Sequence, residues 1–256
     1  MRTLIRVAAI AVALLMAAFV IYVFWDTDGK GNPELSETPA ANPNAFVFTS
    51  HEECRECHPT YFEEWEKSWH RQAWSNPWVQ ASFGCYRDQD CKSCHVPEPL
   101  MANGRSPRLI PRPEGDYDSG INCLTCHISP MGVLGPEGRN IEMAKHCTPV
   151  KHETIATDSM CWECHPNQYD DWMTSSFRGK KGCKDCHMEQ VERSVVPNGP
   201  VRKTRVHFWK GARTLTFLKT SYKFTTETKP EGLVVTVKNG EVGHFLPGER
   251  HNRALW

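Results

Sequence analysis

The longest uninterrupted hydrophobic stretch of the chain lies near its N-terminus, between Val7 and Trp25, and contains no charged residue. As a helix, a stretch of this length would span about 28 Å, which is enough to cross the hydrocarbon core of a membrane. Arg2 and Arg6 precede it, so we expect the N-terminus in the cytoplasm and the following chain on the periplasmic side of the cytoplasmic membrane. The alternative is a cleaved signal peptide, which would also export the chain. Residues 1–25 are therefore predicted to be an anchor or a signal.

The middle of the chain alternates short hydrophobic groups with stretches rich in Pro and Gly. Residues 26–50 are rich in Pro, Gly, Asn, Ser and Thr, which predicts a flexible linker. Over residues 51–212, stretches such as Pro97–Gly120 and Ser129–Gly138 are typical of loops. This pattern predicts a domain that is mainly α-helical and irregular.

Near the C-terminus the pattern changes to one typical of β-strands. Tyr222–Thr228 and Leu233–Lys238 alternate in polarity and are rich in β-branched and aromatic residues, with a Lys-Pro-Glu-Gly turn between them. This predicts a β-hairpin that belongs to a small β-domain over residues 213–256. Such a hairpin would be only marginally stable alone. Because Arg253–Trp256 resembles the beginning of another strand, we expect the sequence to be a fragment that lacks the rest of this domain.

The composition limits the class of protein. A chain of 256 residues corresponds to one or two domains. Only 39% of its residues are hydrophobic and the mean hydropathy is −0.53, so the chain alone would bury a modest core. Its 30 basic and 30 acidic residues balance, and the net charge therefore gives no indication of nucleic-acid binding.

The motif Cys-x-x-Cys-His occurs five times. It is the attachment signature of c-type haem, in which the two thiols add to the haem vinyl groups and the histidine binds the iron. On one helical turn the three side chains share a face, so they can hold one macrocycle. Five covalent haems would supply much of the apolar interior. In chain order, the two haem-attaching cysteines and the iron-binding histidine of motifs 1 to 5 are Cys54, Cys57 and His58; Cys91, Cys94 and His95; Cys123, Cys126 and His127; Cys161, Cys164 and His165; and Cys183, Cys186 and His187.

Two other uses of cysteine are weighed against haem. Structural zinc sites use Cys-x-x-Cys units in pairs and need no histidine after each one, whereas here the number is odd. Disulfides rarely close such short loops. The motifs use ten of the twelve cysteines. The remaining two, Cys85 and Cys147, are either a disulfide pair, which we favour, or free thiols.

Motifs 1 and 4 begin an internal repeat. Counted from the motif histidine, both copies have Pro at +1, an aromatic residue at +4, Trp at +7 and Ser at +10. This spacing predicts a short helix that packs an aromatic face beside a haem. Position +12 is His70 in the first copy and Phe177 in the second, so only the first copy can offer an axial ligand there. The shared positions are Pro59, Phe62, Trp65 and Ser68, and Pro166, Tyr169, Trp172 and Ser175.

The first copy resembles multihaem c-type cytochromes, in particular the group related to the small tetrahaem cytochrome that accepts electrons from hydroxylamine oxidoreductase. The resemblance continues through Ser159–Cys161, Cys183–Met188, Arg205–Gly211 and Gly243–Gly248, and covers roughly residues 46–256. It implies a multihaem cytochrome c fold, with short helices around stacked haems. It also implies that His207 and His244 are distal haem ligands. The sequence departs from the family at Pro247-Gly248, where a threonine often intervenes.

Seven histidines lie outside the motifs and are candidates for the second axial position. The repeat favours His70, and His146 and His152 lie in a short stretch before motif 4. With the two implied by the resemblance, the predicted distal ligands are His70, His146, His152, His207 and His244. His51 is expected to precede a helix and His251 to lie at the surface. Met101, Met131 and Met188 are weaker candidates, because methionine more often fills gaps in a core.

These features favour an exported pentahaem cytochrome that relays electrons in a bacterial respiratory chain, with redox proteins as partners. One alternative is an oxidoreductase acting on a small nitrogen or sulfur compound, which would need an open iron. The lysine that replaces a motif histidine in ammonia-forming nitrite reductases is absent, and no tyrosine stands out as the haem cross-link of hydroxylamine oxidoreductases. A second alternative is a membrane quinol dehydrogenase in contact with the quinol pool.

Overall fold

The computed structural model describes residues 48–83, 89–103, 107–113, 115–136, 149–211 and 213–246. All of them belong to the second of two compact units, Ala41–Trp256. Among them, no helix has the length and hydrophobicity required to cross a membrane. Several predictions fall outside the described residues: the hydrophobic segment Val7–Trp25, nearly all of the linker, and Cys85, His146, Cys147 and His251.

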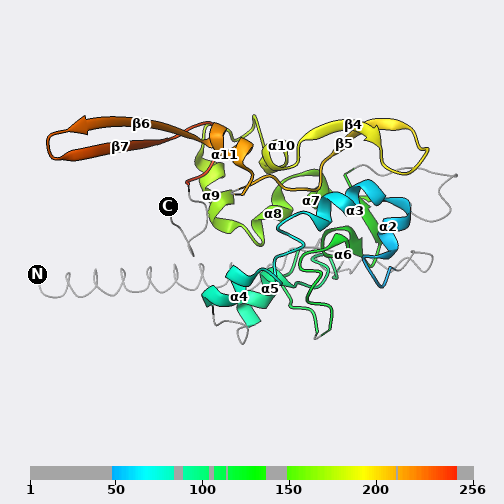
Figure 1. Cartoon of the computed structure of the whole chain (residues 1–256). Helices are drawn as coiled ribbons and strands as arrows, with labels where there is room; N and C mark the ends of the chain where they lie inside the picture. The colour runs from blue at the N-terminus through cyan, green and yellow to red at the C-terminus, as the bar shows by residue number, and fades with distance from the viewer. Residues whose placement is uncertain are drawn as a thin grey trace, which may run out of the picture. The chain divides into compact units, whose positions relative to one another are not determined.

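The described residues form short helices joined by irregular chain, with three small sheets (Figure 1). This agrees with the predicted mixture of helical and irregular structure and a small β part. The longest of these helices, α9, has nine residues. The helices are α2 (Glu53–Cys57), α3 (Pro59–Glu66), α4 (Pro77–Phe83), α5 (Gln89–His95), α6 (Cys123–His127), α7 (Glu153–Ala156), α8 (Ser159–Trp162), α9 (Pro166–Thr174), α10 (Cys183–His187) and α11 (Leu215–Ser221).

In both copies of the repeat the motif histidine is the N-cap of the next helix, and in the first copy His58 also follows the last residue of α2. His58 and His165 have non-helical backbone angles, with φ −126° and −120°, and Pro59 and Pro166 follow at the first helical position. Proline suits that position because its missing N–H needs no partner there and its φ is already helical. The predicted short helices are therefore present as α3 and α9.

The repeat extends into the tertiary structure. The Trp65 indole donates a hydrogen bond to the carbonyl of Ile121, at 2.7 Å, and the Trp172 indole donates to the carbonyl of Lys181, at 2.8 Å. Each acceptor lies two residues before the first cysteine of a later motif, motif 3 or motif 5. The two tryptophans thus dock equivalent helices onto equivalent positions of two further motifs.

Three separate sheets complete the described structure. Strands β1 (Ile128–Ser129), β2 (Gly132–Gly135) and β3 (Val150–Lys151) form one sheet after motif 3, in which β1 and β2 are antiparallel and β2 and β3 parallel. Strands β4 (Gln190–Ser194) and β5 (Val201–Arg205) form an antiparallel hairpin after motif 5. None of these strands was predicted from the sequence.

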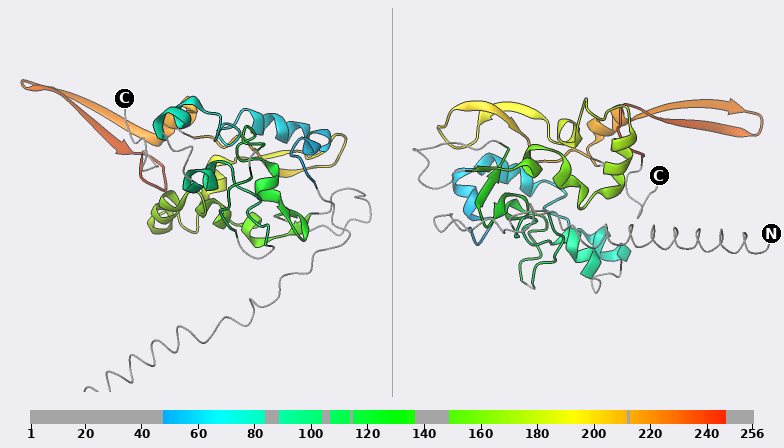
Figure 2. Two further views of the ribbon diagram at one scale, coloured as in Figure 1. Left: turned by 90° about the horizontal axis from the view of Figure 1, so that it is seen from below. Right: turned by 180° about the vertical axis from the view of Figure 1, so that it is seen from behind.

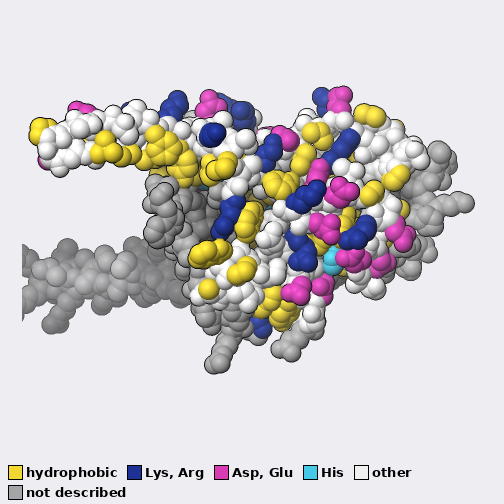
Figure 3. All heavy atoms as spheres, in the orientation of Figure 1, with side chains coloured by type: hydrophobic (Ala, Val, Ile, Leu, Met, Phe, Trp, Pro, Cys, Tyr) yellow, Lys and Arg dark blue, Asp and Glu magenta, His cyan; other side chains and the backbone are white. Residues whose placement is uncertain are grey.

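The predicted C-terminal hairpin is present as β6 (Tyr222–Lys229) and β7 (Gly232–Asn239), which form a long two-stranded ribbon (Figures 1 and 2). The pairs Phe224–Val237, Thr226–Val235 and Thr228–Leu233 share one face. Hydrophobic side chains gather along this ribbon (Figure 3), and Phe224 and Leu233 are 60% and 64% exposed. Helix α11, which precedes the hairpin, was not predicted.

The hydrophobic core of the described chain is small, as the composition predicted. Its buried members come from α3, from the loop after motif 2 and from β2: Phe62, Trp65, Val96, Leu100, Met101 and Leu134. Polar residues are buried beside them. Asn122 caps α6, accepting hydrogen bonds from the backbone N–H groups of Leu124 and Thr125. Capping satisfies amide groups that would otherwise lack a partner at the helix N-terminus.

The chain before motif 3 lies directly against the backbone of His70. Gly120 has φ +56°, and a Cβ there would stand 2.4 Å from the His70 carbonyl oxygen and 2.6 Å from that of Arg71. The N–H of Ile121 donates to the same His70 carbonyl at 2.9 Å. Glycine is required at this position both by its left-handed conformation and by the close approach.

Replacing Gly120 with Ala should lower the free energy of unfolding by roughly 1–3 kcal/mol, because strain in φ and a backbone clash act together. The change should also disturb the environment of His70. Denaturant unfolding of the intact protein measures the loss. Gly179→Ala is the matched control, since Gly179 has φ +75° but nothing within 4 Å of the added Cβ. If both variants lose the same free energy of unfolding, the close packing of Gly120 on His70 does not contribute to stability.

An ion pair joins the β4–β5 hairpin to α3. Both guanidinium nitrogens Nη1 and Nη2 of Arg193 donate to the Glu64 carboxylate, the second at 2.9 Å from Oε2. Glu64 Oε2 also accepts a hydrogen bond from the backbone N–H of His207, at 2.8 Å. Burial alone would raise the pKa of Glu64, but the hydrogen bonds from Arg193 and His207 outweigh it and lower the pKa.

Glu64→Gln should cost roughly 1.5–3 kcal/mol of stability near neutral pH, since hydrogen bonds to a charged group are lost. The folded-state pKa of Glu64 is lowered, so its contribution is present above the unfolded pKa and disappears as the pH falls through the folded pKa. Unfolding of both proteins at several values between about pH 7 and pH 3 should show the difference shrinking on the acid side. Glu63→Gln, at an exposed neighbour, is the control. A difference that does not vary with pH would contradict this assignment.

Candidate haem-binding site

The positions of the ten motif cysteines bear on the zinc and disulfide interpretations. None of these ten forms a disulfide. Among the described residues, only Asp158, Cys161 and Cys183 bring three metal-ligating atoms together, so no set of four thiolates forms a structural zinc site. Burial raises the pKa of the Cys126 thiol to about 11.

The motifs contact one another through their cysteines. The thiols of Cys54 and Cys123, of Cys94 and Cys164, and of Cys161 and Cys183 are close enough to interact and to shift thiol pKa values. Motif 1 therefore lies beside motif 3, and motif 4 lies beside both motif 2 and motif 5. Cys126 of motif 3 is also close enough to motif 4 to affect the pKa of its thiols. The five motifs thus form one group, in which motif 4 lies beside motifs 2 and 5 and near motif 3.

Four motif histidines have the same hydrogen bond, from ring nitrogen Nδ1 to a backbone carbonyl oxygen. A carbonyl can only accept, so Nδ1 carries the proton and Nε2 keeps a free lone pair. Bonds of this kind orient metal-binding histidines and select the ligating nitrogen. The pairs are His58 with Val195 at 2.7 Å, His95 with Ala73 at 2.5 Å, His127 with Leu134 at 2.8 Å, and His187 with Lys210 at 2.5 Å.

Three motif histidines face a second imidazole. The ring centroids are 6.4 Å apart for His165 and His70, and 6.2 Å apart both for His127 and His207 and for His187 and His244. Metal–imidazole bonds are about 2.0–2.1 Å long, so two imidazoles on opposite sides of one metal ion have centroids roughly 6 Å apart once the rings themselves are included. These spacings fit an iron bound between each pair.

The non-motif members of these pairs have properties that suit a ligand. Nδ1 of His207 and of His244 bonds to the carbonyl of Arg205 and of Phe245, each at 2.9 Å, as in the motif histidines. Burial lowers the pKa of His70 to about 3 and that of His207 to about 4. The rings are therefore neutral at physiological pH, which is the form that binds metal. Nδ1 of His70 is buried without a hydrogen-bond partner.

Trp209 and Tyr61, which sequence reasoning did not single out, pack against these histidines. The Trp209 ring contacts His70 edge-on at 4.4 Å and His207 edge-on at 5.3 Å. Its φ of +50° is unusual for a residue with a side chain and marks local strain. The Tyr61 ring contacts His207 at 4.7 Å. The sequence signal for Trp209 was its place in Arg205–Gly211, the segment of the family resemblance that also contains His207.

The other candidate ligands lie elsewhere. In the described part of the chain, no imidazole faces His58 or His95 as in the three pairs. His152 caps α7, where its Nδ1 accepts a hydrogen bond from Thr154 N at 3.3 Å, and no ring contact joins it to a motif histidine among the described residues. Its role as a ligand, like that of His146, stays a prediction. Met101 is buried in the core, and Met131 and Met188 are half-buried.

The comparisons with known proteins agree with this chemistry. Residues 53–128 match the family described as cytochrome c554 and c-prime. This segment contains motifs 1, 2 and 3. No curated protein and no solved structure was found to match the chain. The family match supports a multihaem c-type cytochrome, that is, an electron-transfer protein with covalently bound haem c.

Proposed function

We propose that the chain is an exported pentahaem c-type cytochrome that relays electrons in a bacterial respiratory chain. The observation that carries this proposal is the set of three imidazole pairs at spacings of 6.2–6.4 Å, each containing a motif histidine. When bound, the haems supply one-electron redox centres. The chain has to hold each iron with two neutral imidazoles, orient them and limit access of water.

Each imidazole pair defines one proposed six-coordinate site. His165 and His70, His127 and His207, and His187 and His244 are the proposed axial ligands of the haems in motifs 4, 3 and 5. The His70 assignment agrees with its +12 position in the repeat, and it joins the helix that follows motif 1 to the haem of motif 4. Hydrogen bonds at Nδ1 hold four of the other five rings with Nε2 toward the metal.

The contacts among the motif cysteines support a relay. Motifs 1, 3, 4 and 5 form a continuous series, and motif 2 adjoins it at motif 4. Haems bound at these motifs would be neighbours in the order 1, 3, 4 and 5, so electrons could pass from one haem to the next between motif 1 and motif 5. Motif 1 has the exposed cysteine Cys57, whereas the other motif cysteines are partly buried. We propose motif 1 as a point of exchange with a redox-protein partner.

The finer details of the proposal rest on the sequence. We propose that Val7–Trp25 anchors the protein on the periplasmic side of the cytoplasmic membrane, or exports it if cleaved. We also propose a relation to the tetrahaem cytochrome that accepts electrons from hydroxylamine oxidoreductase. Contact with the quinol pool would follow from the anchor.

A second candidate function is an oxidoreductase acting on a small nitrogen or sulfur compound. The observation that favours it is that no imidazole in the described residues faces His58 or His95, so the irons of motifs 1 and 2 are the candidates for an open coordination position. A substrate would bind there, with acid–base groups nearby.

His70→Ala should convert one low-spin haem to a high-spin or water-ligated form and change at least one midpoint potential. The physical reason is that the motif 4 iron would lose its second imidazole. Electron paramagnetic resonance and a redox titration of the intact protein measure both effects. Phe177→Ala provides the matched control, because Phe177 occupies position +12 of the second repeat and cannot ligate iron. An unchanged low-spin signal in the His70 variant would refute the assignment.

The protein should contain five covalent haems per chain, and at least three irons should bind no carbon monoxide after reduction with dithionite. Acid–acetone extraction should leave the colour with the protein, and a pyridine haemochrome assay should count the haems. Fewer than three haems per chain would refute the proposal.

Stoichiometric carbon monoxide binding at one or two irons, together with turnover of nitrite or hydroxylamine at several per second or more, would establish the second candidate function instead.

A further inference from the structure

His51 is a buried histidine that no part of the proposed relay uses. It precedes α2, and its side chain is only 10% exposed. Its ring stacks on Phe62, with 6.0 Å between centroids and 6° between planes, and meets Trp65 edge-on at 4.9 Å. The ring is therefore held by core residues. Its Nδ1 atom is buried and has no hydrogen-bond partner.

Two carboxylates face the two ring nitrogens of His51. Glu52 Oε1 lies 3.4 Å from Nε2, and Asp116 Oδ2 lies 3.7 Å from Nδ1. A neutral imidazole carries only one N–H, so in either tautomer one carboxylate faces a lone pair, which is repulsive. A second proton removes this repulsion, because both nitrogens then present an N–H to a carboxylate. The two carboxylates therefore favour the protonated ring.

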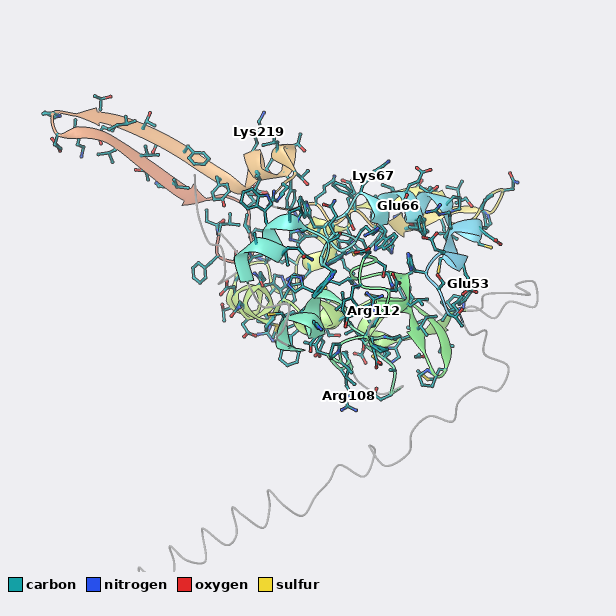
Figure 4. The ribbon with its side chains drawn as sticks, turned by 60° about the horizontal axis from the view of Figure 1, so that its bottom comes forward. Glu53, Glu66, Lys67, Arg108, Arg112 and Lys219 are labelled. Atoms are coloured by element: carbon teal, nitrogen blue, oxygen red, sulfur yellow. The ribbon has the colours of Figure 1, made fainter. Side chains whose placement is uncertain are left out.

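A small pocket gives solvent a route to this group. It has a volume of about 330 Å³, and it is lined by His51, Arg112 and Asp116 together with Pro97, Glu98 and Asn122. The Arg112 guanidinium lies 3.7 Å from Asp116 and its Nε is also buried without a partner. Polar walls of this kind can hold the water through which a proton moves. Figure 4 shows Arg112 among the loops of this region.

The pocket lies beside the attachment points of two haem motifs. The His51 carbonyl accepts a hydrogen bond from Cys54 N at 3.1 Å, and Leu124 and Thr125, which lie between the two cysteines of motif 3, form part of the pocket wall. Cys54 and Cys123 are themselves in contact. A change of charge at the haem of either motif would act on His51 through the protein interior, where Coulomb interactions are stronger than in water.

The charges around His51 leave its proton occupancy sensitive to one added charge. Burial lowers the pKa of His51, as do Arg112 and Arg71, whereas Asp116 and Glu52 raise it, with a net decrease. The balance of these effects favours the neutral ring. Glu98, from the loop after motif 2, adds a further carboxylate to the pocket.

We propose that His51, held between Glu52 and Asp116, is a proton-binding site coupled to reduction of the haems attached at motifs 1 and 3. A one-electron redox partner converts ferric iron to ferrous iron, and His51 takes one proton from water in the pocket. On oxidation, the electron leaves to an acceptor protein and the proton returns to water. The local charge is unchanged over the cycle. The inference rests on the proposed haem content and adds a proton to the proposed electron transfer.

The midpoint potentials of the intact protein, measured between about pH 5 and pH 9, test this coupling. Where uptake of one proton accompanies one electron, the midpoint potential falls by about 59 mV for each tenfold decrease in proton concentration, that is, as the pH rises. The fall should begin at the pKa of His51 in the oxidised protein and should end at its higher pKa in the reduced protein. His51→Gln should abolish this dependence for one haem, and Asp116→Asn should move it to lower pH.

Glu53→Gln is the matched control. Glu53 also lies next to Cys54, but it is exposed, accepts hydrogen bonds from Thr49 and Ser50, and does not line the pocket. It should leave the pH dependence as in the parent protein. The same dependence in His51→Gln as in the parent would overturn the inference.

A second measurement covers the case in which His51→Gln fails to fold. Nuclear magnetic resonance of isotopically labelled histidine in the unaltered protein should give a proton affinity of His51 about tenfold higher in the reduced than in the oxidised state. Equal affinities would overturn the inference. Mass spectrometry of the motif 1 and motif 3 peptides is done in parallel. Peptides without haem would refute the proposed function, whereas peptides with haem and an uncoupled His51 refute only the proton site.

Discussion

The arrangement of the candidate site depends on one interaction, the hydrogen bond from histidine Nδ1 to a backbone carbonyl oxygen. It occurs at six of the histidines proposed as ligands, and in each it leaves Nε2 free to bind metal. Several of the carbonyls come from distant parts of the chain, such as Val195 for His58 and Lys210 for His187. The spacing of a motif determines which side chains can reach one haem, but the tertiary structure determines how each imidazole is turned.

The small core explains why so many polar contacts are buried. A chain with six buried hydrophobic side chains among its described residues has little apolar area with which to fix its loops. Positions are held instead by directed contacts, such as the ion pair of Glu64 with Arg193 and the cap at Asn122. The strained backbone of Trp209, between His70 and His207, belongs to the same arrangement. Strain of this size persists only where the surroundings determine the conformation.

Local features could be predicted from the sequence, and contacts between distant segments could not. The motifs, the helices that begin at Pro59 and Pro166, and the hairpin β6–β7 follow from short-range spacing and turn chemistry. Helix α11 and the hairpin β4–β5 have weaker patterns and were missed. The repeat and the family resemblance selected His70, His207 and His244, yet neither gave their partners. The pairing of His70 with His165 spans a long stretch of chain, and no local preference encodes it.

The two copies of the repeat explain how the site is divided. Motifs 1 and 3 are joined by the Trp65 hydrogen bond and a thiol contact, and motifs 4 and 5 by the corresponding bond of Trp172 and contact of their first cysteines. Each copy could therefore hold two haems as a unit. His70 breaks this symmetry, because it extends from the first copy to His165 of the second, whereas Phe177 occupies the equivalent position and cannot ligate. One iron, bound by His70 of the first copy and His165 of the second, would then join the two copies, so that the folding of each copy would depend on the other.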